Sequence, residues 1–204
     1  MHGEPLPGVD PEYPMTAIAD KTAPQPTGPW VSPGNYTAVL TAGGKSVTQP
    51  LTVRMDPRVK TSTAELVKQY ECSKALYEMR AALLPIGKSF EAVVAELSKA
   101  KERAGENPVR EQLGGLRKKL EEFADPAAVR SGESPKLDAL SKVEKLFGDL
   151  QEVDAGPTPQ AQAALADLQR EMRSVMERWR AIPQDIAALN SKLEAAGLEK
   201  VKFP

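Results

Sequence analysis

The chain has 28 Asp and Glu residues, and carboxylates are candidates for a catalytic acid pair. Glycosidases, for example, hold two carboxyl groups about 5–10 Å apart in a cleft. Adjacent acidic residues occur at Glu121 and Glu122, and Glu144 is a further candidate. All three fall where an amphipathic helix exposes its side chains, so we interpret them as part of a charged, solvated surface.

The single cysteine and the single histidine exclude other kinds of site. Because Cys72 is the only cysteine, the chain can form neither an internal disulfide nor a multi-thiolate metal site. His2 is the only histidine, so zinc sites of the common kinds lack ligands. The strongly helical stretch around Cys72 favours a buried structural thiol over a nucleophile. We therefore predict no catalytic, cofactor-binding or metal-binding residue, and no cofactor.

The charge balance argues against nucleic acid as a partner, and the hydropathy pattern argues against a membrane-spanning helix. With 27 basic and 28 acidic residues the net charge is −1. The chain therefore lacks the excess of basic residues that would indicate nucleic-acid binding. No apolar run approaches the ~20 residues of a membrane-spanning helix. The N-terminal run MHGEPLPGVD has neither the basic start nor the apolar core of a signal peptide, so we predict none.

The composition changes near residue 60, and this change predicts two domains. Prolines are concentrated before it, whereas Ala, Leu, Glu and Lys dominate after it. We predict a proline-rich segment and β-hairpin over residues 1–58 and a four-helix bundle over residues 59–204. The fold class is then α+β, and mainly α.

The first of these domains is predicted to contain one β-hairpin after its proline-rich segment. Eight prolines in residues 1–35 forbid a helix there and leave room for a short strand at Tyr13–Ala19. Strands are predicted at Asn35–Thr41 and Ser46–Met55, around a tight primed turn at Gly43-Gly44. Pro50 indicates an edge position or a bulge in the second strand.

The predicted hairpin carries an apolar face. Alternation places Tyr36, Leu40, Leu51 and Val53 on one side, where they would be the inner face of a larger sheet. A single hairpin is too small to be stable alone in water. We expect this face to be partly uncovered unless the helices cover it. Beyond the strand end, Asp56 and Arg58 can form a local pair with a structural role.

The remainder of the chain has helical periodicity throughout. Predicted helices span residues 62–104, 108–124, 135–153 and 158–196, with a Pro-, Gly- and Ser-rich loop at 125–135. Short turns between them predict an up-down-up-down order. Ser62 and Glu65 form a capping box at the start of the first helix, and Gly197 provides a left-handed cap at the end of the last.

Two of these helices contain a proline. The apolar spacing stays in phase on both sides of Pro85 and of Pro183, whereas a reversal of the chain would reset it. We therefore predict two long helices that are kinked but continuous, the second with its kink near Trp179–Pro183.

Two sequence runs carry a resemblance to a known family. These are GPWVSPGNYTAVLTAGGKSVTQPLTVRMDPRVKTS and RWRAIPQDIAALNSKLEAAGL. Together they resemble the C-terminal region of bacterial sortilin-like β-propeller proteins, catalogued as glycosyl hydrolases of the BNR or Asp-box repeat type. The resemblance implies an immunoglobulin-like unit after a propeller, a helical tail, and a periplasmic or secreted location.

The resemblance carries over no catalytic residue, because the propeller's Ser-x-Asp-x-Gly-x-x-Trp turns do not occur in this sequence. We expect a non-catalytic accessory and interaction module, a fragment lacking the propeller, whose partner is an upstream propeller domain or a separate protein. Two alternatives remain: part of a glycoside hydrolase whose catalytic residues lie upstream, and a coiled-coil oligomerisation module.

Overall fold

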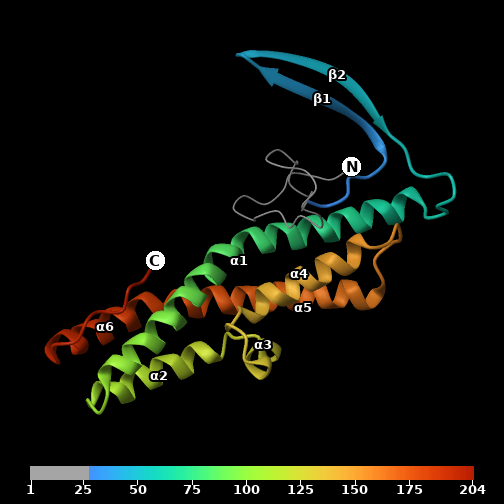
Figure 1. Ribbon diagram of the computed structural model, residues 1–204. Coiled ribbons are helices and arrows are strands. Elements are labelled where there is room, and N and C mark those ends of the chain that lie inside the picture. The colour runs from blue at the N-terminus through green and yellow to red at the C-terminus, as the bar shows by residue number, and fades with distance from the viewer. Residues whose placement is uncertain (1–27) are drawn as a thin grey trace. The chain divides into compact units, whose positions relative to one another are not determined.

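The computed structural model describes residues 28–204, which form one antiparallel hairpin followed by helices (Figure 1). The predicted fold class, α+β and mainly α, is confirmed. The short strand predicted at Tyr13–Ala19 lies outside the described residues, as does His2. In chain order the elements are β1 (Gly34–Ala42), β2 (Lys45–Val53), α1 (Thr63–Ala104), α2 (Val109–Glu121), α3 (Pro126–Ser131), α4 (Asp138–Gln151), α5 (Pro159–Trp179) and α6 (Ile182–Ala195).

The hairpin turns on the predicted glycine pair. Gly43 has φ 56° and Gly44 has φ 76°, the two positive values that a type I′ turn requires. The register pairs Ala42 with Lys45 at the turn and Gly34 with Val53 at the open end. The primed turn predicted from the sequence is thus confirmed, and β1 and β2 pair over nine residues each without a bulge.

Helix α1 begins at the predicted cap and continues without a break to Ala104. The amide of Ser62 donates to Glu65 Oε2 (3.1 Å), and the amide of Glu65 donates to Ser62 Oγ (3.3 Å). This reciprocal pair is the predicted capping box. Pro85 lies inside the helix and does not interrupt it, as its in-phase surroundings indicated.

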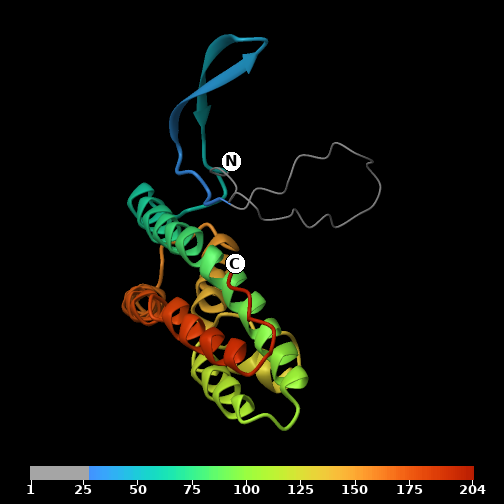
Figure 2. The ribbon, with the colours of Figure 1, turned by 90° about the vertical axis from the view of Figure 1, so that its left-hand side faces the viewer.

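The prediction of one continuous helix over residues 158–196 is wrong. The segment forms two helices, α5 and α6, separated at Arg180 and Ala181. Pro183 has no N–H to donate to the carbonyl of Trp179 and is accommodated in the first turn of α6 instead. The interruption falls in the region where a kink was predicted, and the chain bends there without reversing (Figures 1 and 2).

The predicted loop at residues 125–135 contains a short helix, α3. Asp125 caps it by accepting a hydrogen bond from the amide of Ala127 (2.8 Å), and Pro126 occupies its first turn. Gly132, with φ 74°, ends it in the left-handed conformation. The same Pro and Gly residues that indicate a loop are therefore also the start and stop signals of a six-residue helix.

The chain divides into two compact units. Among the described residues, the first consists of residues 28–77 and 147–162, and the second of residues 78–146 and 163–204. The first unit thus includes residues on both sides of the boundary predicted at residue 58. Helix α1 contributes to both units.

The second unit holds a core centred on Trp179, which is 8% exposed. Its ring centroid lies 6.4 Å from that of Phe90, 5.9 Å from Phe123 and 6.3 Å from Phe203. The Arg178 guanidinium stacks 4.3 Å above the Phe123 ring. Fully buried aliphatic side chains complete this core: Leu83, Val93, Leu97, Leu113, Leu120, Leu137, Val143, Ile182, Ile186 and Leu193.

Candidate interaction site

The hairpin of the first unit is anchored at its base by Trp30. The Trp30 backbone N–H donates to Gln151 Oε1 (2.7 Å), and its indole Nε1–H donates to the Gln151 carbonyl (3.1 Å). On the other side of the hairpin, the Thr61 hydroxyl donates to the Asp154 carbonyl (2.5 Å). The segments that lead into and out of the hairpin are therefore both bonded to the C-terminal end of α4 or to the loop that follows it.

A buried amide stabilises the same region. Gln69 is 7% exposed, and its Nε2 donates to the carbonyls of Leu150 (2.6 Å) and Val153 (2.5 Å). Gln151 Nε2 in turn donates to the hydroxyl of Ser73, which is fully buried. The two bonds from Gln69 satisfy carbonyls at the end of α4 and just beyond it, where a helix leaves carbonyls without partners.

A cavity of about 240 Å³ lies between these anchors and the hairpin. Leu66 and Gln69 of α1 line it on one side, and Trp30, Val53 and Met55 line it on another. The Ser32 hydroxyl, also in its wall, is the one buried side-chain polar atom without a hydrogen-bond partner in residues 28–204. The lining also includes Arg54, Asp56 and Asp154, so the cavity combines apolar and polar walls.

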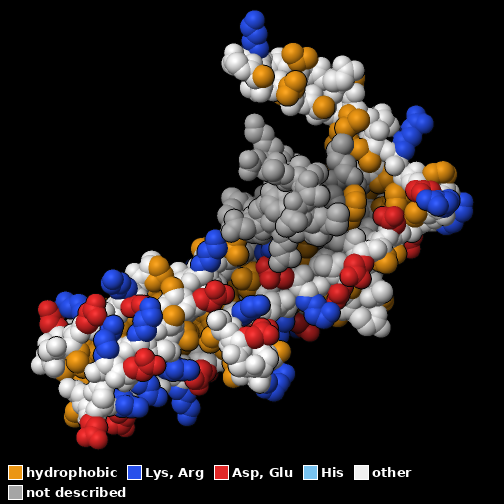
Figure 3. Space-filling view, viewed as in Figure 1, with side chains coloured by type: hydrophobic (Ala, Val, Ile, Leu, Met, Phe, Trp, Pro, Cys, Tyr) orange, Lys and Arg blue, Asp and Glu red, His pale blue; other side chains and the backbone are white. Residues whose placement is uncertain are grey.

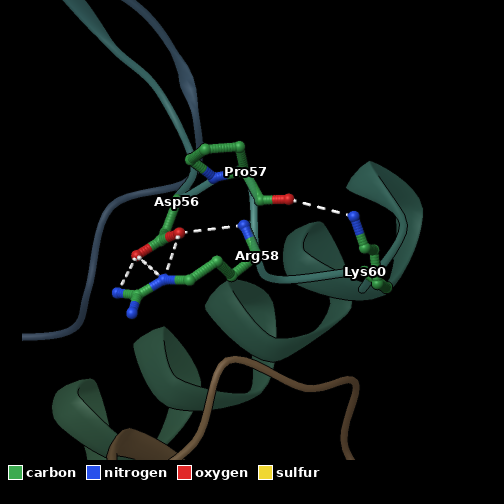
Figure 4. Close-up of polar contacts among 4 residues, drawn as sticks. All are labelled: Asp56, Pro57, Arg58 and Lys60. Carbon is green, nitrogen blue, oxygen red and sulfur yellow. Dashed lines mark hydrogen bonds and ion pairs between the residues drawn. The ribbon is translucent and has the colours of Figure 1, made fainter.

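An ion pair closes the turn that follows the hairpin (Figure 4). Arg58 Nη2 lies 2.6 Å from Asp56 Oδ2, and the Arg58 amide donates to Asp56 Oδ1 (2.9 Å). The side chain and then the amide of Arg58 hold the pKa of Asp56 below its ordinary value. Lys60 Nζ donates to the Pro57 carbonyl (3.1 Å). The predicted local pair is confirmed, and its geometry is that of a stabilised turn.

The apolar face of the hairpin is partly uncovered, as the sequence predicted. Leu40 is 70% exposed and Val47 is 67% exposed, while Leu51 is 37% exposed. Tyr36 and Val53, nearer the base, are half-buried, and the Tyr36 hydroxyl donates to the Ser32 carbonyl (2.6 Å). Apolar side chains are visible along the hairpin in the space-filling view (Figure 3). We call this surface, Tyr36, Leu40, Val47, Leu51 and Val53, the open face.

The carboxylates considered for catalysis are each close to an arginine. Glu144 accepts a hydrogen bond from Arg80 Nε (3.0 Å). Glu121 lies 3.4 Å from Arg117, and Glu122 lies 3.7 Å from Arg178. All three carboxylates lie in the second unit and are exposed, in agreement with the charged-surface interpretation, although Arg80 itself is only 14% exposed.

Cys72 is half-buried in α1. Burial first, and the Glu71 carboxylate second, raise the pKa of its thiol above the ordinary value. A thiol with a raised pKa is a poor nucleophile at neutral pH.

Within residues 28–204, no group of three or more His, Cys, Asp or Glu side chains is placed to hold a metal ion. Among the helices of the same residues, none has the length and apolar character needed to cross a membrane.

Sequence reasoning missed the anchor at the base of the hairpin. One signal was present: Gln69 falls between Leu66 and Ser73 on the apolar stripe of α1, where a polar residue must find a buried partner. Nothing in the sequence identifies that partner, because Gln69 and the carbonyls it binds are 81 and 84 residues apart.

Comparison with known proteins gives no match: no family model, no curated protein and no solved structure is significantly similar to this chain.

Proposed function

We propose that this chain is a non-catalytic accessory and interaction module of a sortilin-like β-propeller protein, with the propeller lying outside these 204 residues. The partner is a propeller domain, and the contact is the open face of the hairpin. The resemblance of the hairpin run to that family motivates the choice of partner. The immunoglobulin-like assignment of the hairpin and an exported location belong to the same proposal.

The observation that supports an interaction role is the exposure of apolar side chains on an anchored hairpin. Leu40 and Val47 are exposed although the base of the hairpin is bonded through Trp30 and Thr61. Burying one such aliphatic side chain stabilises a complex by about 1.5–3 kcal/mol. Exposed apolar side chains that cluster on one face are typical of an interaction surface.

The test is binding of the purified chain to a purified sortilin-like propeller from the same genome, measured by isothermal titration calorimetry. We expect Leu40→Asp to weaken binding by at least about tenfold, because it places a charge in the apolar contact. Thr48→Asp is the matched control, since Thr48 points to the opposite face of the hairpin, and it should bind nearly as well as the wild type. No binding, or equal loss in both variants, would overturn the proposal.

The same preparation tests the enzymatic alternative. The isolated chain should not hydrolyse aryl glycosides. Turnover that is lost in Glu121→Gln or Glu144→Gln would show that a carboxylate pair of this chain is catalytic, and the module would then be an enzyme.

Mass measured by light scattering over a range of concentrations tests the coiled-coil alternative, which requires an oligomer.

A further inference from the structure

The two outer edges of the hairpin differ in their capacity to accept another strand. In an antiparallel pair, residue pairs that exchange hydrogen bonds alternate with pairs whose N–H and C=O groups point away from the partner strand. A two-residue turn is closed by a hydrogen-bonded pair, here Ala42 with Lys45. Counting back from the turn, the pairs with outward-facing backbone groups are Thr41–Ser46, Val39–Thr48, Thr37–Pro50 and Asn35–Thr52.

Pro50 blocks the outer edge of β2. It occupies an outward-facing position, where the hairpin does not need its missing N–H but an additional strand would. The outer edge of β1 has no such block, because residues 34–44 contain neither a proline nor a charged side chain. Among residues 28–204, β1 pairs only with β2. Its outer edge therefore lacks both of the devices, proline and charge, that commonly protect a strand edge from pairing.

We infer that β1 pairs antiparallel with β1 of a second copy of this chain, about a two-fold axis at Ala38, and forms a four-stranded sheet in the order β2–β1–β1–β2. The outward-facing residues of β1 are centred on Ala38. With the axis there, Thr37 lies opposite Val39 of the second copy, and Asn35 lies opposite its Thr41. Every outward N–H and C=O group of β1 then has a partner, which no other two-fold register of this strand achieves.

The same register matches the side chains of the open face. It places Tyr36 opposite Leu40 of the second copy, and Ala38 opposite its own equivalent. These are the positions without hydrogen bonds in the new ladder, where side chains approach most closely. Leu40 is 70% exposed in one copy, so its contact with the Tyr36 ring covers apolar surface that the single chain leaves open. The small side chain of Ala38 allows close approach on the axis.

The charge distribution suits a second copy as the occupant. Lys45 and Arg54 are the charged side chains of residues 28–55, and they lie in β2 or directly after it. In the four-stranded sheet the two β2 strands are three strand spacings apart, about 14 Å. That separation exceeds the Debye length of about 10 Å at 0.1 M salt. The uncharged β1 edge thus meets an equally uncharged edge, without like charges near the contact.

Pro50 also limits the assembly to two copies. Pairing of β1 with β2 of the next copy would leave a free edge on each added chain and would generate an open filament. The missing N–H of Pro50 disfavours that pairing. Once the two β1 strands have paired, both outer edges of the sheet are β2 edges that carry Pro50, so the dimer is closed.

The size of the contact indicates a weak dimer. The nine residues of β1 span about 30 Å, and a sheet is about 10 Å thick. The contact therefore covers about 300 Å² of each copy, about 600 Å² in total, whereas stable complexes bury about 1,200–2,000 Å². We expect half of the chains to be dimeric at a concentration on the order of 100 μM.

The test is sedimentation velocity of the full chain from about 10 μM to 1 mM. We expect reversible exchange between monomer and dimer, without larger species. A chain that remains monomeric at 1 mM overturns the inference. Larger oligomers would show that Pro50 does not close the assembly, and they overturn it as well.

Two proline variants of the same residue pair locate the contact. Val39→Pro removes an outward N–H of β1 and should raise the dissociation constant at least about tenfold. Thr48→Pro removes the outward N–H of the paired residue on β2 and should leave the dimer unchanged. Neither N–H belongs to the ladder of the hairpin. Equal loss in both variants, or a dimer that persists in Val39→Pro, contradicts the β1 contact, and the second result would assign self-association to the helices.

A charge exchange at the axis tests the register. Ala38→Lys and Ala38→Glu each place two like charges opposite one another, so each variant alone should be monomeric at 1 mM. An equimolar mixture of the two should recover the dimer, because opposite charges then meet. Gln49→Lys, at the residue of β2 that pairs with Ala38, is the control and should dimerise as the wild type does. Failure of the mixture to associate would overturn the register. All these measurements are made without a propeller, so this inference and the propeller proposal can fail separately.

Discussion

At the N-terminus of α1, two side chains bond the backbone amides that a helix leaves without partners. The hydroxyl of Ser62 accepts from the Glu65 amide, and the Glu65 carboxylate accepts from the Ser62 amide. An N-cap of this kind contributes about 1 kcal/mol. The cap also sets where α1 begins, and hence the length of the turn that links the hairpin to it.

Removal of the hydroxyl tests this cap. We expect Ser62→Ala to lower the free energy of unfolding by about 1 kcal/mol, measured by urea denaturation. Thr63→Ala is the matched control, because Thr63 is exposed and one residue further along. A control that costs as much as Ser62→Ala would argue against the cap as the cause.

The capping box should also depend on pH. The Ser62 hydroxyl, and then its amide, hold the pKa of Glu65 below the ordinary value. Because the folded pKa is the lower one, the stabilisation is complete above the unfolded pKa of about 4.3 and is lost as pH falls through the folded pKa. Amide protection in the first turn of α1 should fall between about pH 5 and pH 3. In Glu65→Gln, which keeps the bonding geometry without the charge, this fall should be absent.

Gln69 is a second residue whose bonds can be tested directly. Gln69→Leu removes the amide that donates to the carbonyl oxygens of Leu150 and Val153, and it leaves both of these oxygens without that partner. We expect a loss of about 1–3 kcal/mol in the free energy of unfolding. Gln112→Leu, at an exposed position of α2, should change it by less than about 0.5 kcal/mol. Equal effects would mean that the buried amide has no special role.

At the scale of elements, the two prolines in predicted helices occupy different helical positions in the structure. Pro85 lies deep within α1, whereas Pro183 lies in the first turn of α6 after a two-residue interruption. Both side chains are exposed, so replacing them changes little packing. The energetic difference between them therefore comes from the backbone: an interior proline removes a helix hydrogen bond, and a first-turn proline does not.

This difference predicts that the same substitution stabilises the protein at Pro85 and has little effect at Pro183. Pro85→Ala should raise the free energy of unfolding by about 1–3 kcal/mol, because it restores a donor to the Ala81 carbonyl. Pro183→Ala should change it by less than about 0.5 kcal/mol. Urea denaturation of both variants checks this, and a larger gain at Pro183 than at Pro85 would contradict it.

At the scale of the whole molecule, the two units are stabilised by different means. The first combines hydrogen bonds from Trp30, Gln69 and Gln151 with the smaller set of buried side chains that includes Leu66, Leu76 and Leu150. The second is built around Trp179 and the aromatic rings it contacts. Buried apolar area, rather than hydrogen bonding, is therefore the main source of stability in the second unit.

The two tryptophans form a matched pair for testing this contrast. Trp179→Ala should cost about 3–5 kcal/mol in the free energy of unfolding, because Trp179 is only 8% exposed. Trp30→Ala should cost less, about 1–3 kcal/mol, since Trp30 is 42% exposed and loses its indole hydrogen bond and only part of the burial that Trp179 loses. If Trp179→Ala and Trp30→Ala lowered the free energy of unfolding by similar amounts, the aromatic core around Trp179 would not be a main source of stability in the second unit.

The sequence by itself determined the features that depend on neighbouring residues. Gly43 and Gly44 specify the turn, Ser62 and Glu65 specify the start of α1, and Gly197 specifies the end of α6, where the Leu198 amide donates to the Leu193 carbonyl (2.8 Å). Alternation also predicted the open face. In each case the interacting groups are a few residues apart, so the local backbone conformation decides the outcome.

Only the tertiary structure decided the rest. The sequence pattern around Pro183 is as regular as that around Pro85, yet one helix is interrupted and the other is not. The anchor between Trp30 and Gln151 joins residues 121 positions apart. Which distant groups meet depends on how all the apolar faces pack at once, and no local pattern contains that information.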